Sequence, residues 1–441
     1  MTLDELRALV ERGEIDTVVL AMTDMQGRLQ GKRMDAEAFV ADIAAHGAEA
    51  CNYLLAVDVE MNTLDGFALT SWEAGYGDFV LRPDLATLRP MPWLEGTVMC
   101  LADVEHHDGS PVVESPRQIL RAQIARLAER GWMANIGSEL EFVLFRESYD
   151  SAREKGYRNL KPANAYNVDY SVLGTTMVED VIRPIRLAMK AAGLKVEDSK
   201  GECNLGQHEI NFRYRDALGM ADDHVFYKLA AKEIAYQHGA AITFMAKLDE
   251  REGNSCHIHC SFWEDGTPLF AEREGVYDAY IAGQVAHTHE LSMFFAPNVN
   301  SYKRYAYGSF APTTLLWAAD NRTCAFRSVG HGPSLRLETR IAGGDANPYL
   351  AFAAIIAAGL DGIDSALPPV PPVAGSAYDA DGQRMPTTLA EAVDLLDRSA
   401  FARAAFGDRV VDHYVNSGRH EVRAFESAVT DWEWTRSFER A

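Results

Sequence analysis

Acidic and histidine side chains stand at alternate positions in two apolar segments of this sequence. Glu139 and Glu141 lie in GSELEFVLF, and His257 and His259 lie in NSCHIHCSFW. Side chains two residues apart in a β-strand point to the same face, so each pair can face one cleft. Two neighbouring carboxylates repel each other unless they share a cation. The pattern predicts a divalent-metal site, although a solvated strand face explains the glutamates alone equally well.

Two further segments supply carboxylates that can return to the same place. Glu202 and Glu209 flank a glycine-containing loop in GECNLGQHEINF, and Glu338 lies between Arg336 and Arg340 in RLETR. A carboxylate between two guanidinium groups suits a metal ligand flanked by anion-binding groups, and it equally suits a surface ion-pair ladder. Taken alone, the Glu202 and Glu209 segment fits a surface loop better.

Cys256 and Cys260 raise the alternative of a zinc site. On a strand, however, both cysteines point to the face opposite the two histidines, which spoils a four-ligand site. We therefore expect both cysteines in the core.

The sequence contains no standard phosphate-binding loop. It lacks GxxxxGK[S/T] and a strand–GxGxxG–helix unit, so an ATP site has to be built in another way. Arg304 in NSYKR and Arg322 and Arg327 in DNRTCAFR lie near apolar and aromatic residues. That setting suits arginines that hold phosphates or carboxylates, although each one singly fits the surface as well.

The elements around these residues predict an α+β fold with mainly antiparallel strands rather than a regular βαβ array. The first hundred residues are strand-rich after an amphipathic opening helix, and the Asp108–Gly109 turn predicts domains at 1–108 and 109–441. Strands are expected at 17–24, 132–145, 207–214, 242–247, 256–263 and 334–343. Helices are expected at 117–131, 180–193, 223–239, 276–295 and 347–363.

Composition narrows the class of protein. The chain has 441 residues, 47% of them hydrophobic, and a formal charge of −22 from 42 basic and 64 acidic residues. This acidity argues against nucleic acid or an anionic membrane as the main partner. No apolar run approaches the roughly 20 residues of a membrane span, and the N-terminus lacks the apolar core of a signal peptide. With six scattered cysteines, the expected location is the cytoplasm.

Six of these segments, in this order, resemble the glutamine synthetase family across nearly the whole chain. They are GSELEF, ECNLGQHE, GNSCHIHCS, NSYKR…AP, NR…R and LETR…ANPYL, and LRPDLATLRPMPW in the N-terminal part matches the family too. The resemblance implies a small N-terminal β-grasp domain and a catalytic domain with a curved, mainly antiparallel sheet. It also implies homo-oligomeric rings of six, commonly stacked into dodecamers, with active sites between neighbouring subunits.

Carried over position by position, the resemblance implies two divalent cations, Mg²⁺ or Mn²⁺, in each active site and ATP as a substrate. One cation would be held by Glu141, Glu202 and Glu209, and the other by Glu139, His257 and Glu338. Glutamate would be bound by Gly253, Arg304 and Arg340. The phosphates would be bound by Arg322 and Arg327, and the nucleotide side by His259 and Ser261. Asp78 occupies the place of a family aspartate that helps to activate ammonia.

The sequence departs from the family where the nitrogen nucleophile is bound. Glutamine synthetases carry a proton-accepting glutamate in a flap reading NSYKRLVPGYEAP, whereas this chain reads NSYKRYAYGSFAP, with Phe310 in the glutamate's place. The family's DGSS segment is also changed, because Phe67 and Ala68 follow Asp65 and Gly66. Phe310 cannot accept a proton, but it can pack on the carbon chain of an amine or contact its ammonium.

This departure resembles the γ-glutamyl-amine ligases of the superfamily, whose acceptors include ethanolamine, polyamines and other small amines. One alternative is a glutamine synthetase that uses ammonia and has a changed flap. A second alternative is a structural member of the superfamily without catalysis. The second is disfavoured, because all six metal positions hold good ligands whose carboxylates repel one another without a cation.

Overall fold

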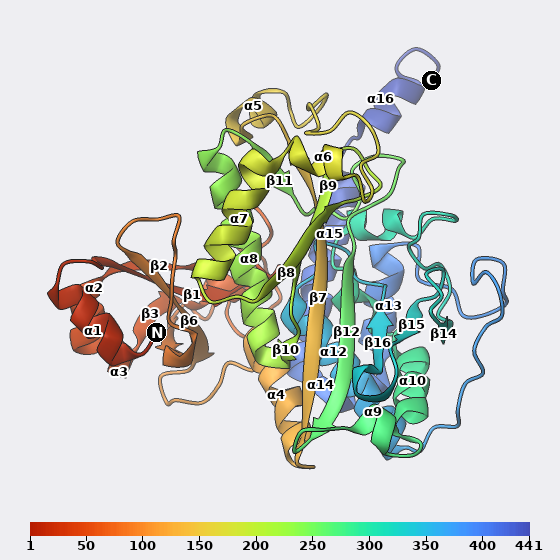
Figure 1. Cartoon of the computed structure of the whole chain (residues 1–441), viewed down its shortest axis with the longest axis horizontal. Coiled ribbons are helices and arrows are strands. Elements are labelled where there is room, and N and C mark those ends of the chain that lie inside the picture. The colour runs from red at the N-terminus through yellow and green to blue at the C-terminus, as the bar shows by residue number, and fades with distance from the viewer.

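The N-terminal part of the chain forms a six-stranded sheet. The computed structural model describes all 441 residues. The strands of this first sheet are β1 (Thr17–Thr23), β2 (Leu29–Asp35), β3 (Ala48–Cys51), β4 (Asp78–Pro83), β5 (Arg89–Pro90) and β6 (Thr97–Glu105). Their order is β2-β1-β6-β4-β3, with β5 paired to β6, and the only parallel pair is β1 with β6. The sheet lies to one side of the molecule in Figure 1.

Short helices cover this sheet. They are α1 (Leu3–Glu11), α2 (Ala36–Ala38) and α3 (Ala44–His46). The first is capped by Thr2, whose hydroxyl accepts from the Glu5 amide while the Glu5 carboxylate accepts from the Thr2 amide. Such a capping box satisfies amide groups that the first helical turn leaves free. The amphipathic opening helix expected from the sequence is confirmed.

The rest of the chain contains a ten-stranded sheet. Its strands are β7 (Trp132–Phe145), β8 (Val196–Gly201), β9 (Gln207–Phe212), β10 (Arg215–Asp216), β11 (Ala241–Thr243), β12 (Cys256–Glu264), β13 (Thr267–Pro268), β14 (Trp317–Ala319), β15 (Phe326–Val329) and β16 (Arg336–Thr339). The main path is β14-β15-β16-β12-β7-β9-β8, antiparallel except for β14 with β15. The α+β class with mainly antiparallel strands is confirmed.

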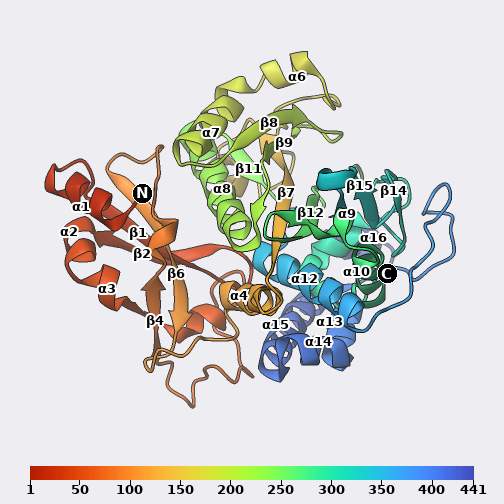
Figure 2. The same ribbon diagram turned by 60° about the horizontal axis from the view of Figure 1, so that its bottom comes forward.

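Helices pack around one central buried helix. The longer ones are α4 (Pro116–Ala128), α7 (Glu179–Ala191), α8 (Ala217–Gln237), α10 (Val276–His287), α12 (Pro348–Asp364), α13 (Leu389–Arg398) and α15 (Asp408–Ser427). The shorter ones are α5 (Tyr149–Glu154), α6 (Val172–Thr176), α9 (Leu269–Glu272), α11 (Ser292–Phe295), α14 (Ala400–Phe406) and α16 (Asp431–Ser437). Because α12 is apolar on nearly every side, it is buried against α4, α8 and α10 (Figure 2). The α16 helix projects from the body of the molecule (Figure 1).

Most sequence-predicted elements are present, with one clear error. The strand expected at 132–145 coincides with β7, and the helix expected at 347–363 is α12. The single helix expected at 276–295 is wrong, because α10 ends at His287 and α11 begins at Ser292. The His287 ring lies 2.8 Å from a Glu290 carboxylate oxygen through Nδ1 and 2.7 Å from Asp361 through Nε2. These contacts lie at the break between α10 and α11, which the continuous apolar pattern of the sequence does not predict.

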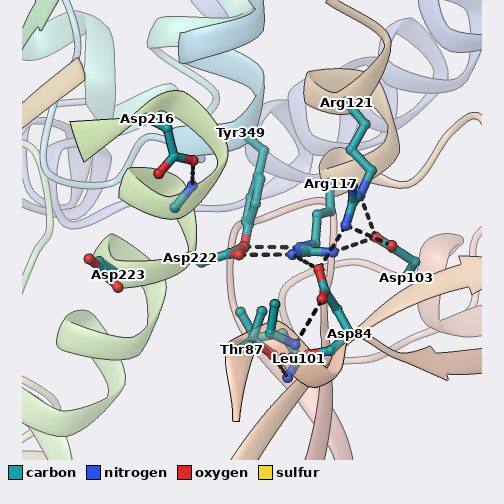
Figure 3. A network of polar contacts seen from close by, with 12 residues as sticks. Asp84, Thr87, Leu101, Asp103, Arg117, Arg121, Asp216, Asp222, Asp223 and Tyr349 are labelled. Atoms are coloured by element: carbon teal, nitrogen blue, oxygen red, sulfur yellow. Dashed lines mark hydrogen bonds and ion pairs between the residues drawn. The ribbon is translucent and has the colours of Figure 1, made fainter. Parts of the chain in front are cut away.

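A buried ion-pair network joins the first sheet to the helices (Figure 3). Arg117 on α4 bonds Asp222 on α8 through Nε at 3.0 Å and through Nη2 at 2.8 Å. The same guanidinium bonds Asp103 on β6 at 2.6 Å and Asp84 at 2.7 Å. Arg121 bonds both Asp84 and Asp103. The predicted domain boundary at 108/109 falls in the connection between β6 and α4, and it stays a prediction.

None of the helices combines the length and the apolar character that a membrane span requires.

Candidate active site

Neighbouring strands of the larger sheet bring the predicted metal-binding residues together. Antiparallel pairing sets Glu141 of β7 opposite Glu209 of β9, and His257 of β12 opposite Glu139 of β7. On the other side of β12, Glu338 of β16 is the register partner of His259. Like charges directly opposite each other destabilise a sheet, so the Glu141 and Glu209 pairing points to a ligand between them.

These strands form the floor of a cavity of about 460 Å³. All six predicted metal ligands line it: Glu139, Glu141, Glu202, Glu209, His257 and Glu338. So do five other predicted site residues: Gly253, Phe310, Arg322, Arg327 and Arg340. Only three of its 22 lining residues are hydrophobic, so it suits charged ligands.

Three carboxylates form the first cluster that could hold a metal ion. Oxygen atoms of Glu141, Glu202 and Glu209 lie within 4.8 Å of one another. Burial raises the pKa of Glu209 to about 8, and the negative charges of Glu141 and Glu139 contribute in the same direction. The charge of Lys200 lowers this pKa only in part, so the burial and the neighbouring carboxylates outweigh it. Oxygen donors in this arrangement fit a hard divalent cation, and the donor set therefore fits the predicted metal.

A second cluster contains Glu139 with two histidines. Oε1 of Glu139 lies 2.9 Å from Nε2 of His259, and Oε2 lies 3.4 Å from Nδ1 of His257. The same His257 nitrogen lies 3.8 Å from Glu338. Burial opposes ionisation of Glu139, but hydrogen bonds with both histidines lower its pKa well below the ordinary range. His259, predicted on the nucleotide side, thus lies as close to this cluster as the predicted ligand His257.

Two arginines face Glu338 from either side. Arg340 forms an ion pair with one of its oxygens, and Arg327 bonds the other at 2.9 Å. Although burial raises the pKa of Glu338, the charges of His257 and Arg340 outweigh it and lower that pKa to about 2. Nε of Arg340 is buried and has no partner within the chain. An orphaned donor beside the cavity fits an oxygen of a bound carboxylate or phosphate.

Arg304 lies differently from the other predicted arginines. Its side chain is fully buried and does not line the cavity. Its guanidinium donates to backbone carbonyl oxygens of Arg340, Ile341 and Ala342, and at 3.1 Å to the Ser255 hydroxyl. In this arrangement it holds the segment after β16, and its predicted role in binding glutamate stays a prediction.

A second cavity of about 550 Å³ adjoins the first and shares Glu139, Asp198 and Asn211 with it. The predicted nucleotide-side residues His259 and Ser261 line this second cavity. Its remaining lining includes aromatic rings and one arginine: Phe212, Tyr214, Trp263 and Arg336. Flat apolar surfaces beside a charged group suit a heterocyclic base and its phosphates.

Two residues that the sequence reasoning missed contact the carboxylates. Nε2 of Gln207 lies 3.0 Å from Glu141, 3.0 Å from the Gly253 carbonyl oxygen and 3.1 Å from the Asn254 side-chain oxygen. Lys200 forms an ion pair with Glu202. Strand alternation could have found Gln207, because it lies two residues before Glu209 on β9 and shares its face.

Phe310 and Asp78 complete the predicted set. Phe310 is 52% exposed, lines the first cavity and takes a left-handed backbone conformation with φ 57°. Its carbonyl oxygen accepts a bond of 3.4 Å from Arg340. Asp78 is exposed at the start of β4 in the N-terminal sheet and lines neither cavity. The chain by itself therefore does not bring Asp78 to the site.

The predicted zinc alternative finds no support in the geometry. Cys256 and Cys260 are buried members of the core, and neither belongs to any cluster of potential metal ligands. All six cysteines are free thiols.

Comparisons with known proteins show which proteins this chain is similar to. The family model described as "Glutamine synthetase, catalytic domain" matches residues 113–437. The chain is 58% identical to gamma-glutamylethanolamide synthetase GlnA4 of Streptomyces coelicolor, covering 99% of this chain and 96% of that protein. It is 37% identical to glutamate–isopropylamine ligase of a Pseudomonas species, covering 98% and 97%. A solved GmaS/ADP complex superposes with a TM-score of 0.87 at 29% identity, covering 98% and 99%.

Proposed function

The chain belongs to the glutamine synthetase family, and we propose that it joins the γ-carboxyl group of glutamate to ethanolamine. It is an ATP-dependent ligase for glutamate and an organic amine, in the class of the two amine-using relatives. ATP, glutamate and the amine give the γ-glutamyl amide, ADP and phosphate. The finer choice of ethanolamine rests on the 58% identity with the ethanolamide synthetase.

We propose that the two carboxylate clusters hold Mg²⁺ or Mn²⁺, two ions in each active site. The first would use Glu141, Glu202 and Glu209, and the second Glu139, His257 and Glu338. When bound, such ions neutralise the phosphate oxygens during phosphoryl transfer. Two features support this proposal. Carboxylate oxygens are good donors to such ions, and burial and the neighbouring carboxylates raise the pKa of Glu209, which a bound cation would offset.

The chain's own arginines would position the reacting groups. We propose that Arg340, with its unpartnered Nε, binds glutamate together with Gly253. Arg322 and Arg327 would bind the phosphates from the same cavity. The fixed positive charges of these arginines would stabilise the negative charges that come together when the phosphoryl group moves from ATP to the γ-carboxylate. The γ-glutamyl phosphate that forms is an activated acyl group, and attack by a neutral amine releases phosphate.

The observation that favours an organic amine over ammonia is Phe310 in the cavity. A carboxylate at this position attracts ammonium and can take its proton, whereas an aromatic ring does neither. The half-exposed ring offers an apolar surface to the carbon chain of an amine and a face to its ammonium group. Ethanolamine presents both a short carbon chain and a cationic nitrogen.

Phosphate release tests this proposal directly. The full-length protein is assayed with ATP, Mg²⁺ and glutamate, and the amine is ethanolamine, isopropylamine, putrescine or ammonium. We expect the highest kcat/KM with ethanolamine and little turnover with ammonium. Efficient turnover with ammonium alone would show that the protein makes glutamine, and it would refute the proposal.

The variant Phe310→Glu restores the family's flap carboxylate and tests the role of the ring. We expect ammonium turnover to rise and ethanolamine turnover to fall, each by about tenfold. A tenfold change corresponds to the free energy of roughly one charge-assisted hydrogen bond. The control Phe425→Glu makes the same change on an exposed ring that lines neither cavity. An unchanged amine profile in Phe310→Glu would remove Phe310 from acceptor recognition.

We also propose that the protein forms a homo-oligomer of six-membered rings, stacked as a dodecamer. We propose further that it is located in the cytoplasm and that each chain has domains at 1–108 and 109–441. The support for rings is the family together with Asp78, which is exposed and lies outside both cavities of its own chain. In a ring Asp78 would reach a neighbouring active site. Light scattering gives the oligomer mass. A monomer that is fully active would contradict this part of the proposal.

A further inference from the structure

Lys200 places a positive charge in the wall of the cavity. It lies on β8, opposite Glu209 in the pairing of β8 with β9. Its ammonium forms an ion pair with Oε1 of Glu202, and it lies 3.9 Å from Glu209. The same ammonium lies 4.9 Å from the centre of the Tyr170 ring. Because the side chain is 23% exposed, solvent screens this charge only in part.

The partners of Lys200 are those that an amine substrate would seek. A carboxylate and an aromatic face together attract an alkylammonium group. Both Glu202 and Tyr170 line the cavity that holds Phe310, so they lie within the space open to an acceptor. In this chain the ammonium of Lys200 already contacts them. A second ammonium brought to this wall would meet a like charge instead of an unoccupied carboxylate.

The other charged residues of this part of the wall are acidic, so its positive charge comes from Lys200. Asp169, Asp198 and Glu252 also line the cavity, outside the clusters of proposed metal ligands. Without Lys200 this part of the wall would carry acidic groups and the Tyr170 ring, a combination that favours polycationic amines. With Lys200 it carries a hydrogen-bond donor that suits a neutral oxygen, such as a hydroxyl group.

We infer that Lys200 is a specificity-determining residue that selects acceptor amines whose far end is uncharged. This inference rests on the proposed function, since it concerns the same amine site. The ammonium of Lys200 disfavours a diamine through repulsion of its second charge. It favours an amino alcohol by donating a hydrogen bond to the hydroxyl oxygen. Glu202 has two oxygens, so it can keep this ion pair and still serve a cation in the neighbouring cluster.

The experiment compares putrescine, a diamine, with ethanolamine in the full-length protein at saturating Mg²⁺. The substitution K200M removes the charge and keeps an unbranched side chain. We expect the kcat/KM ratio of putrescine to ethanolamine to rise roughly tenfold or more, because unit charges a few ångströms apart repel strongly at a partly buried wall. The variant K200R keeps the charge and should keep the wild-type ratio. The control K195M changes an exposed lysine that lines neither cavity.

A binding measurement supplies a readout independent of turnover. Because the charge of Lys200 repels a cation held beside Glu202, K200M should bind Mn²⁺ several-fold more tightly than the wild type in calorimetry without amine. A wild type that uses ethanolamine, with an unchanged amine ratio and unchanged Mn²⁺ affinity in K200M, would overturn this inference alone. A wild type that uses only ammonium would overturn the proposed function, and the inference with it.

Discussion

Two groups of carboxylates in this molecule differ in how completely the chain's own cations balance their charge. In the network of Figure 3, the guanidinium groups of Arg117 and Arg121 bond three aspartates, Asp84, Asp103 and Asp222. Burial raises the pKa of Asp84, but the hydrogen bond and charge of Arg117 outweigh it and lower that pKa. Each charge therefore has its partner within the chain.

The cavity contains more negative charge than its own cations can balance. Six glutamates line it, namely Glu139, Glu141, Glu202, Glu209, Glu252 and Glu338. The pKa of Glu209 is raised to about 8, opposite in direction to the shift of Asp84. The comparison teaches that burial alone does not distinguish a structural charge from a functional one. Within the cavity, histidines and Arg340 lower the pKa values of Glu139 and Glu338, so the raised pKa of Glu209 marks the carboxylate that the chain's own cations balance least.

The largest expected effect comes from breaking the cavity cluster. Glu209→Gln removes one proposed ligand, and we expect kcat to fall by roughly a thousandfold, about 4 kcal/mol of lost transition-state stabilisation. The thermal midpoint of the metal-free variant should not fall, because one of several repelling carboxylates is gone. Phosphate release and thermal unfolding measure the two effects. Activity within tenfold of the wild type would show that Glu209 holds no essential cation.

The matching change in the network should act on stability and not on chemistry. Arg117→Met leaves the buried Asp222 without a counter-charge, whereas Asp84 and Asp103 keep Arg121. An unpaired buried charge costs about 3 to 4 kcal/mol of unfolding free energy. Urea unfolding measures the loss, and the folded fraction should keep its kcat. The control Arg398→Met breaks an exposed pair with Asp394, whose side chains are 74% and 63% exposed, and should cost under about 0.5 kcal/mol. Equal losses in both variants would contradict the comparison.

A smaller effect is expected from the residue that orients a proposed ligand. Gln207 is buried and its amide bonds Glu141 and the Gly253 carbonyl oxygen. Gln207→Met keeps the volume and removes these bonds, so the affinity for Mn²⁺ should fall roughly 10- to 100-fold. Calorimetry measures it. If only the thermal midpoint changed while Mn²⁺ affinity stayed the same, Gln207 would be a packing residue.

The smallest expected effect concerns pH and the network. The pKa of Asp84 is below its ordinary 3.8 in the folded chain, so its stabilisation is present above that value and is lost as the pH falls through the folded pKa. Asp84→Asn should therefore cost about 1 kcal/mol at pH 7 and progressively less below about pH 4. Urea midpoints of both proteins across this range test the sign. A difference that grew on acidification would refute it.

The sequence by itself determined which residues share a strand face. Alternation predicted that Glu139 and Glu141 both face one cleft, and both line the first cavity. It also predicted that Cys256 and Cys260 turn to the core, where both are buried. These inferences hold because the twofold period of a strand is local and needs no knowledge of the partner strands.

Only the tertiary structure decided which side chains meet across strands and loops. It set Glu141 opposite Glu209, turned Arg304 toward backbone carbonyl oxygens and brought Lys200 to the ring of Tyr170. It also left Asp78 on the other sheet, outside both cavities. The physical reason is that register and side-chain partners depend on the packing of segments far apart in sequence, whereas strand and helix periodicity depends on near neighbours alone.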